Sequence, residues 1–218
     1  MLEEGRYIRA RTAEQKRERM DAIMAAADGL FSGMPYHRIT MGLIADKLGW
    51  SRAGLYKYAG TQEEIFLALH AEKNRAWIDE LVAELANAPM PHGEFARTWA
   101  EVTARHGSFL RYQDILISII ESNVSLERLV EFKRSFAEML PPVTSLLSRQ
   151  CGIDGAAAAD LYLRLLFQAT GLWNHFNCAE LTREAMARAG LPPITGTFIE
   201  TYADFTGMCL EFASRHDG

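Results

Sequence analysis

The sequence predicts an all-α fold, and three observations lead to this prediction. Apolar residues recur at intervals of three and four over most of the chain, and the two-residue alternation of amphipathic strands is nearly absent. Glycine and proline stand mainly between these periodic segments, where helices end. The 218 residues are 49% hydrophobic and 23% charged, a composition that excludes disordered and collagen-like chains and is sufficient for a buried core.

The first predicted helix covers residues 12–31. It carries an apolar stripe along one face, formed by Met20, Ile23, Met24, Ala27, Leu30 and Phe31, and it ends before Gly33-Met34-Pro35. Two short helices are predicted next, over residues 40–48 and 51–58. Because only Gly49 and Trp50 separate them, the chain must turn sharply between the two.

A longer helix is predicted over residues 61–85. It begins with Thr61 and Glu64 at the spacing of a capping box, in which the two residues satisfy free backbone donors of the first turn. Its face is polar between Leu69 and Trp77 and apolar on both sides of that stretch. This pattern indicates a helix that passes from one packing unit to another.

Six further helices are predicted after a proline-rich break at residues 87–91. They cover residues 93–106, 109–122, 125–149, 155–177, 180–189 and 196–214. Pro141 and Pro142 lie inside the third of these. We expect a kink there, because proline removes a backbone donor and clashes with the preceding turn.

The helices over 155–177 and 196–214 are apolar on more than one side. A monomer of this size leaves little chain to cover both, so we predict that they form a helical bundle between two subunits. The alternative is a thickly packed core within a monomer. The predicted interface residues are Tyr162, Leu166, Trp173, Phe198, Tyr202 and Phe205.

Charge is divided unevenly along the chain, whose formal net charge is −5. Residues 1–60 carry ten Lys and Arg against seven Asp and Glu, which leaves 13 against 21 for residues 61–218. The three cysteines form no CxxC pair, and no targeting or membrane-spanning segment is recognised. We therefore expect a cytoplasmic protein with a basic N-terminal part and no membrane partner.

The stretch over residues 51–58 combines the side chains that a helix needs to enter a DNA groove. Ser51 is a good N-cap beside free backbone donors, while Arg52 and Lys57 supply positive charge. Small residues (Ala53 and Gly54) permit close approach, and Tyr56 and Tyr58 offer hydroxyl groups. Taken alone, the same stretch also fits an ordinary solvated helix.

The wider pattern over residues 18–70 resembles the N-terminal domain of the TetR family of transcriptional regulators. The matching positions hold their spacing without a gap. They are Phe31, Tyr36, Thr40, Ile44, Ala45, Leu48, Gly49, Ser51, Gly54, Leu55, Tyr56, Tyr58, Glu63 and Phe66. The rest of the chain is similar to the family in length, helix content and its two apolar final helices.

The resemblance implies a three-helix helix-turn-helix domain over residues 1–60 and a helical domain over 61–218 that binds an effector and dimerises. It further implies a homodimeric repressor on a near-palindromic operator in double-stranded DNA, although repression and activation are not separated. The implied DNA contacts are Thr40, Trp50, Ser51, Arg52, Ala53, Gly54, Tyr56, Lys57, Tyr58 and Gln62. Trp50 has two interpretations, one against the sugar-phosphate backbone and one against the first helix.

The sequence departs from the family pattern at the end of this domain. Ala59 stands where the family has an aromatic residue, and we expect Trp50 or Tyr58 to fill that space. Gln62 replaces a frequent lysine and so removes one positive charge facing phosphate. These departures keep open an alternative function, a helical protein-interaction module that has lost specific DNA binding.

Enzyme motifs for phosphate, dinucleotide, metal and acyl chemistry are absent from the sequence, and we predict no catalytic activity, cofactor or metal site. The family resemblance places a small-molecule effector among the middle helices. Aromatic side chains with few polar groups suit an apolar or aromatic molecule. The candidates are Trp99, Phe109, Tyr112, Leu116, Phe132 and Phe136, each of which also fits an ordinary core position.

Overall fold

The computed structural model describes residues 2–216 and the side chains of residues 13–215. These residues form helices and contain no β-strand, which confirms the predicted all-α class. The α-helices are α1 (Leu2–Gly33), α2 (Met41–Leu48), α3 (Arg52–Leu55), α4 (Gln62–Glu84), α5 (His92–Arg105), α6 (Gly107–Ile115), α7 (Leu126–Cys151), α8 (Gly155–Phe176), α9 (Glu180–Arg188) and α10 (Phe198–His216). Among them, no helix is both long enough and apolar enough to cross a lipid bilayer.

The chain divides into two compact units. Unit 1 comprises Met1–His70 and Leu116–Val130, and unit 2 comprises Ala71–Ile115 and Glu131–Gly218. The predicted head over residues 1–60 falls within unit 1. That unit also takes in the first turns of α4 and residues 116–130, both of which were predicted to lie in the second domain.

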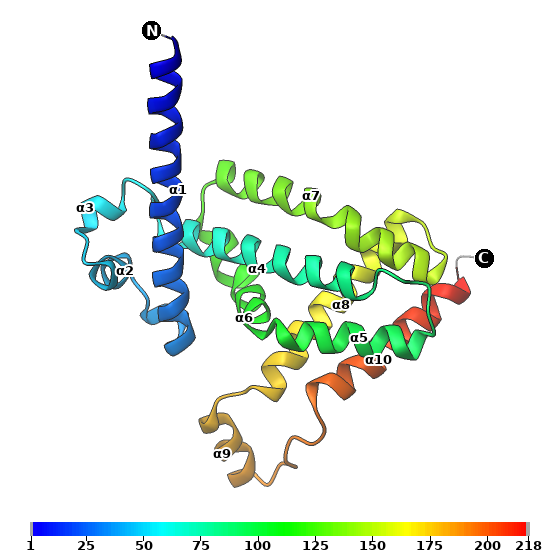
Figure 1. Ribbon diagram of the computed structural model, residues 1–218. Helices are drawn as coiled ribbons and strands as arrows, with labels where there is room; N and C mark the ends of the chain where they lie inside the picture. The colour runs from blue at the N-terminus through cyan, green and yellow to red at the C-terminus, as the bar shows by residue number, and fades with distance from the viewer. Residues whose placement is uncertain (1, 217–218) are drawn as a thin grey trace. The chain divides into compact units, whose positions relative to one another are not determined.

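Unit 1 is built on α1. Its side chains Ile23, Ala27 and Phe31 are buried, α2 packs against it, and α3 packs against α2 (Figure 1). The helix begins about ten residues before the expected start, because residues 2–11 lack the apolar stripe used to find it but favour a helix through their Arg, Glu and Ala content. It ends at Gly33, and a 3₁₀ turn, Tyr36–Arg38, follows Pro35.

Helix α4 begins as predicted. The Glu64 backbone N–H donates to Thr61 Oγ1 at 3.2 Å, and the Glu64 carboxylate accepts from the Gly60 N–H at 2.8 Å. The returning bond therefore reaches one residue further back than in a standard capping box. The helix is unbroken over 23 residues, and the boundary between the two units falls within it, after His70.

The helix predicted over residues 109–122 is regular only as far as Ile115. A π-helical turn, Leu116–Ile120, and a 3₁₀ turn, Glu121–Asn123, follow it. Both keep the apolar residues roughly one turn apart, so periodicity does not distinguish them from an α-helix. The prediction was wrong for these residues.

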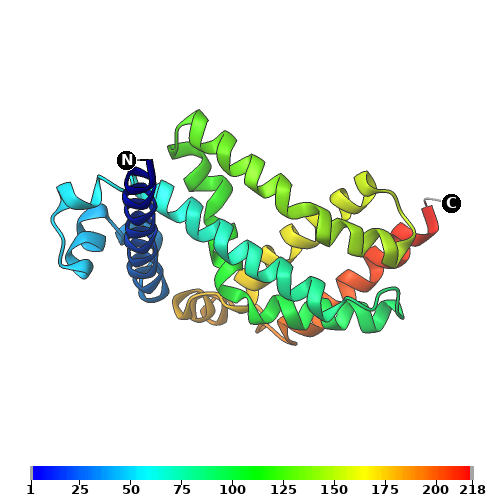
Figure 2. The ribbon, with the colours of Figure 1, turned by 45° about the horizontal axis from the view of Figure 1, so that its top comes forward.

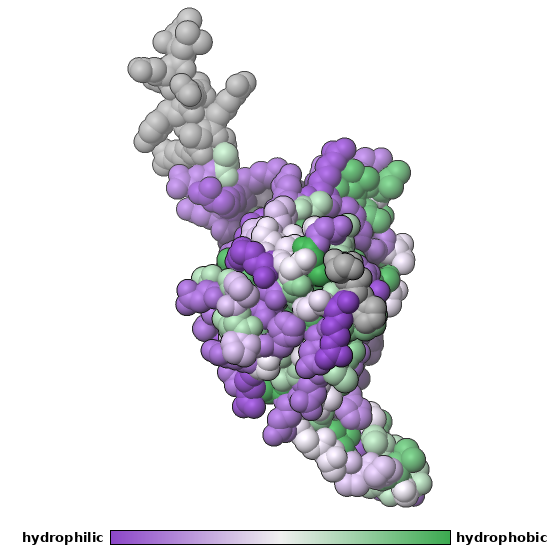
Figure 3. All heavy atoms as spheres, turned by 90° about the vertical axis from the view of Figure 1, so that its right-hand side faces the viewer, coloured by the Kyte–Doolittle hydropathy of each residue, from purple (hydrophilic) through white to green (hydrophobic). Residues whose placement is uncertain are grey.

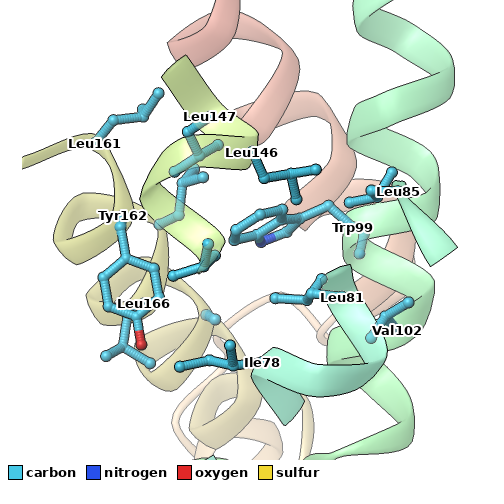
Figure 4. Close-up of a cluster of buried hydrophobic side chains, with 14 of the residues drawn as sticks. Ile78, Leu81, Leu85, Trp99, Val102, Leu146, Leu147, Leu161, Tyr162 and Leu166 are labelled. Atoms are coloured by element: carbon cyan, nitrogen blue, oxygen red, sulfur yellow. The ribbon is translucent and has the colours of Figure 1, made fainter. Parts of the chain in front are cut away.

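Unit 2 has a core in which α10 lies along α5 and also packs against α8 (Figure 2). Trp99 of α5 points into this core between Leu81 of α4 and Leu146 of α7 (Figure 4). Its indole N–H donates to the Tyr202 hydroxyl at 3.0 Å, and that hydroxyl donates to the Leu165 carbonyl at 2.9 Å. Two buried hydrogen bonds thus join α5, α10 and α8.

Helix α7 continues through Pro141 and Pro142. The Thr144 hydroxyl donates to the Leu140 carbonyl at 3.1 Å, immediately before the two prolines. The two prolines remove the N–H groups that would bind the carbonyls of Ala137 and Glu138, four residues earlier, and not the Leu140 carbonyl. The kink at this position stays a prediction.

Candidate nucleic-acid interface

The turn between α2 and α3 depends on a glycine. Gly49 has φ 68° and ψ 27°, a left-handed conformation that side chains disfavour. The Trp50 N–H donates to the Ala45 carbonyl at 2.9 Å and closes the end of α2. Three residues, Gly49 to Ser51, therefore join α2 to α3, in agreement with the predicted sharp turn.

Two hydroxyl side chains cap the helices of this motif. Thr40 Oγ1 accepts from the Leu43 N–H at 3.2 Å, and Ser51 Oγ accepts from the Gly54 N–H at 3.1 Å. Both residues are exposed. Since each oxygen accepts within its own helix, each hydroxyl hydrogen remains available to donate to an outside acceptor.

Helix α3 is shorter than the predicted 51–58 helix. It covers Arg52–Leu55, and Tyr56 to Tyr58 form a turn in which the Tyr58 N–H donates to the Leu55 carbonyl at 2.9 Å. The segment buries Leu55 and Ala59 against the rest of unit 1. It exposes Ser51, Arg52, Ala53, Tyr56 and Lys57, with Gly54 and Tyr58 half-buried, so most of its residues that are predicted to meet DNA are exposed.

Arg52 lies against the backbone of α2. A Cβ atom built at Gly42 would come within 2.7 Å of Arg52 Nη2 and 3.0 Å of Nε, so the guanidinium occupies the space that the glycine leaves. Gly42 is in the first turn of α2, which Thr40 caps. The positive charge of Arg52 is therefore added to the N-terminal end of α2, where free N–H groups already favour an anion.

Trp50 packs against the first helix. The Arg19 guanidinium of α1 lies 4.8 Å from the centroid of its ring, and the Tyr58 ring lies 6.0 Å away at 45°. Trp50 thus contacts the first helix, and its contact with the sugar-phosphate backbone stays a prediction. Arg19 was missed in the sequence analysis, because it is 31 residues from Trp50 and nothing in local spacing connects them.

The start of α4 is held by its acidic residues. The Tyr36 hydroxyl donates to Glu63 Oε1 at 2.8 Å, and the Tyr36 ring meets Phe66 edge-on at 4.8 Å. Burial and the neighbouring Glu63 carboxylate raise the pKa of Tyr36, so it stays a neutral donor. Gln62 is half-buried beside them, and its contact with DNA stays a prediction.

Most of the candidate effector residues lie in unit 2, where they pack against other rings. Phe109 stacks on Trp77 with centroids 5.0 Å apart, and the Lys73 ammonium lies 5.5 Å from the Tyr112 ring centroid. Trp99, Phe109, Tyr112 and Phe132 are buried and Phe136 is half-buried, whereas Leu116 is buried in unit 1. The structure therefore does not place all six in one unit.

The predicted dimer residues are largely inside the single chain. Tyr162, Leu166, Phe198 and Tyr202 are buried, and Trp173 packs edge-on against Phe198 at 5.2 Å, while Phe205 is half-buried. The apolar side chains that α8 and α10 do expose are Leu163, Phe167, Met208 and Phe212. From the side where α10 ends, the surface shows hydrophobic side chains among hydrophilic ones (Figure 3).

A cavity of about 470 Å³ also lies between these two helices. Asp160, Arg164, Met208, Cys209 and Phe212 are among its lining residues. Arg164 Nε and Asp160 Oδ2 form an ion pair at 2.7 Å within it. The groove is thus mainly apolar, with one paired charge.

Comparisons with known proteins agree with this architecture. A model of the bacterial regulatory proteins of the tetR family matches residues 23–69, and a model of the tetracyclin repressor-like C-terminal domain matches residues 71–211. No curated protein sequence matches the chain.

Solved structures with the same fold share little sequence with this chain. The fatty acid degradation regulator FadR from Bacillus halodurans is 15% identical with a TM-score of 0.57, covering 90% of this chain and 96% of its own. A protein from Mesorhizobium loti assigned to the TetR family is 18% identical with a TM-score of 0.56, covering 91% and 96%. A TetR regulator from a Rhodococcus species is 13% identical with a TM-score of 0.53, covering 94% and 100%. Because the two family models match most of its length, the chain belongs to the TetR family of bacterial transcriptional regulators.

Proposed function

We propose that this chain is a homodimeric, ligand-responsive repressor that binds a palindromic operator and leaves it when a small molecule binds. The observation that carries the proposal is the free side of α2 and α3. Thr40 and Ser51 offer hydroxyl donors there, and Arg52 and Lys57 offer positive charge on a segment anchored by buried Leu55. Hydroxyl and cationic groups bind phosphates, and small residues let the backbone approach base edges.

Dimerisation is supported by the outer faces of α8 and α10. Phe167 is 51% exposed and Phe212 is 60% exposed. Leu163 and Met208, on the same two helices, are exposed as well. Large apolar side chains on adjacent helices are costly to leave in water, and a second copy of the chain covers them symmetrically. Two heads in one dimer then read two inverted half-sites.

Release by a ligand is supported by the continuity of α4. The same 23-residue helix carries Phe66 in unit 1 and Trp77 in the core of unit 2. A ligand held by unit 2 that displaces this helix also displaces the packing of the head. The ligand must bind the form that releases DNA more tightly, since only differential affinity shifts a population.

The test of DNA binding begins with selection of duplexes from a random library by the purified dimer, followed by gel retardation. We expect an inverted repeat whose half-sites place two recognition segments in successive major grooves, about 34 Å apart. Arg52→Gln should weaken binding to this duplex. Arg97→Gln removes the same charge from an exposed position on α5 and should leave affinity unchanged.

One result would replace the proposal. If the chain is folded and dimeric but recovers no DNA sequence and retards no duplex at low salt, the interaction-module function is favoured instead.

A further inference from the structure

A concave notch lies within unit 1, beside residues 51–58, which we call the recognition segment. Its volume is about 290 Å³, and its lining residues are Arg19, Trp50, Ser51, Gly54, Lys57 and Tyr58. Arg19 comes from α1, Trp50 from the turn, and the others from α3 and its ends. The notch therefore joins the first helix of the head to the residues predicted to face DNA.

One lining residue of the notch, Trp50, has two neighbours that contact its ring. The Arg19 guanidinium lies over the Trp50 ring at 4.8 Å, and the Tyr58 ring contacts it from another side at 6.0 Å. A guanidinium on an aromatic face keeps its plane fixed while its N–H groups point outward. Arg19 is thus preoriented, although it is an exposed side chain on a long helix.

The chemistry of the lining suits an anion attached to an apolar group. Two of the six lining residues are cationic and none is acidic. The Ser51 hydroxyl hydrogen is free to donate. A Cβ atom at Gly54 would contact only Ser51 Oγ, at 3.3 Å, so no other side chain blocks the approach of a ligand at that point. In DNA, a phosphodiester supplies negative charge for the two cations, and the adjoining sugar supplies an apolar surface for the indole.

We propose that this notch seats one phosphodiester of the DNA backbone between Arg19 of α1 and Lys57, with Trp50 against the adjoining sugar. This inference rests on the proposed DNA-binding function and extends it to α1. A DNA phosphate is favoured over a free one because Ser51, Gly54 and Lys57 belong both to the notch and to the recognition segment. Arg19 becomes a residue that sets the position of the head on the duplex.

The first experiment compares Arg19→Gln with Arg17→Gln on the selected operator. Both variants remove one exposed positive charge from α1, and Arg17 does not line the notch. Each phosphate contact contributes about 0.9 to the slope of log K against log salt, which corresponds to about eight-fold in affinity at 0.1 M salt. With one notch per subunit, we expect Arg19→Gln to weaken binding by roughly 60-fold and to lower the slope by about two.

The second experiment locates the phosphate. Methylphosphonate is neutral, and it replaces one phosphate at a time along one half-site of the operator. One position should cost the wild-type protein about eight-fold and Arg19→Gln clearly less, since only the Lys57 contact to that phosphate remains in the variant. Arg17→Gln should respond to the substitution like the wild type.

The outcomes distinguish failure of the notch proposal from failure of the proposed DNA-binding function. The notch proposal is overturned, while operator binding stands, if the two arginine variants lose the same operator affinity. It is also overturned if no methylphosphonate position is coupled to Arg19. No operator binding by the folded wild type overturns both. If inorganic phosphate binds the wild type but not Arg19→Gln at matched ionic strength, and does so without displacing the operator, the notch is a site for free phosphate and the DNA assignment is overturned. Circular dichroism melting of each variant checks that the head is folded.

Discussion

At Gly107, the first residue of α6, the indole of Trp173 occupies the space where a side chain would begin. A Cβ atom there would lie 1.9 Å from Trp173 Cζ2, and the ring itself packs edge-on against Phe198. Gly107→Ala should therefore destabilise the fold by about 1–3 kcal/mol, because a rigid ring must move. Gly93→Ala, in α5 with open space around it, should be neutral or stabilising by up to about 1 kcal/mol. Urea unfolding measures both, and equal stabilities would show that Trp173 moves freely.

Glu80 gives a second residue-scale prediction, which concerns pH. His106 Nε2 lies 2.6 Å from Glu80 Oε2, and Arg105 Nε lies 2.6 Å from Glu80 Oε1. These contacts hold the pKa of Glu80 below its usual value, and the His106 hydrogen bond has the largest effect. A lowered pKa stabilises the folded chain above the unfolded pKa, and the effect is lost as pH falls through the folded value.

Glu80→Gln tests this sign. The variant should be less stable than the wild type by about 0.5 kcal/mol at pH 7, a small value because the carboxylate is partly exposed. The difference should shrink as pH falls from about 5 toward 3. A difference that is constant over this range in urea unfolding would contradict the assignment.

At the scale of elements, the sequence was most informative where local chemistry determines structure. The caps at Ser51 and Thr61 and the turn at Gly49 could be predicted because each depends on a few neighbouring residues. The shortened α3 and the π-helical turn after Ile115 could not, because both replace one helical hydrogen-bond pattern with another over the same apolar spacing.

The prediction at this scale concerns the exposed apolar residues of α8 and α10 and their role in dimerisation. Phe212→Glu or Phe167→Glu should shift the chain from dimer to monomer in sedimentation equilibrium, because a charge would be desolvated at the contact. Leu181→Glu on α9, at a position 77% exposed, is the control and should leave the dimer intact. A dimer that survives both phenylalanine variants would place the interface on other helices.

For the whole molecule, the prediction is that ligand and operator oppose each other through α4. An effector found by thermal-shift screening should bind more weakly in the presence of saturating operator, by the same factor by which it weakens operator binding. Ala76→Gly should soften the exposed side of α4 and reduce that factor, whereas Ala187→Gly makes the same change in α9 and should not. An effector that binds equally tightly with and without saturating operator would contradict the coupling.

The two parts of the molecule differ in how far the sequence predicts them. The exposed residues of the helix-turn-helix motif were predictable because Ser51 to Lys57 lie in one short, contiguous stretch. The exposed apolar residues of α8 and α10 were not predictable, because periodicity identifies apolar sides of a helix without telling which side the chain itself covers. Tyr202 is buried, while Phe212 on the same helix is exposed. Arg19 and Trp50 likewise meet only through the tertiary fold.

The most direct test of two heads acting together on a palindrome is the spacing of the half-sites. An insertion of about five base pairs between them turns one half-site to the opposite face of the duplex, while about ten restores the face at a greater distance. We predict that the five-pair insertion lowers dimer affinity to nearly the value for a single half-site, as measured by fluorescence anisotropy at fixed salt. Unchanged affinity with both insertions would show that the heads bind independently and would contradict the proposed dimeric repressor.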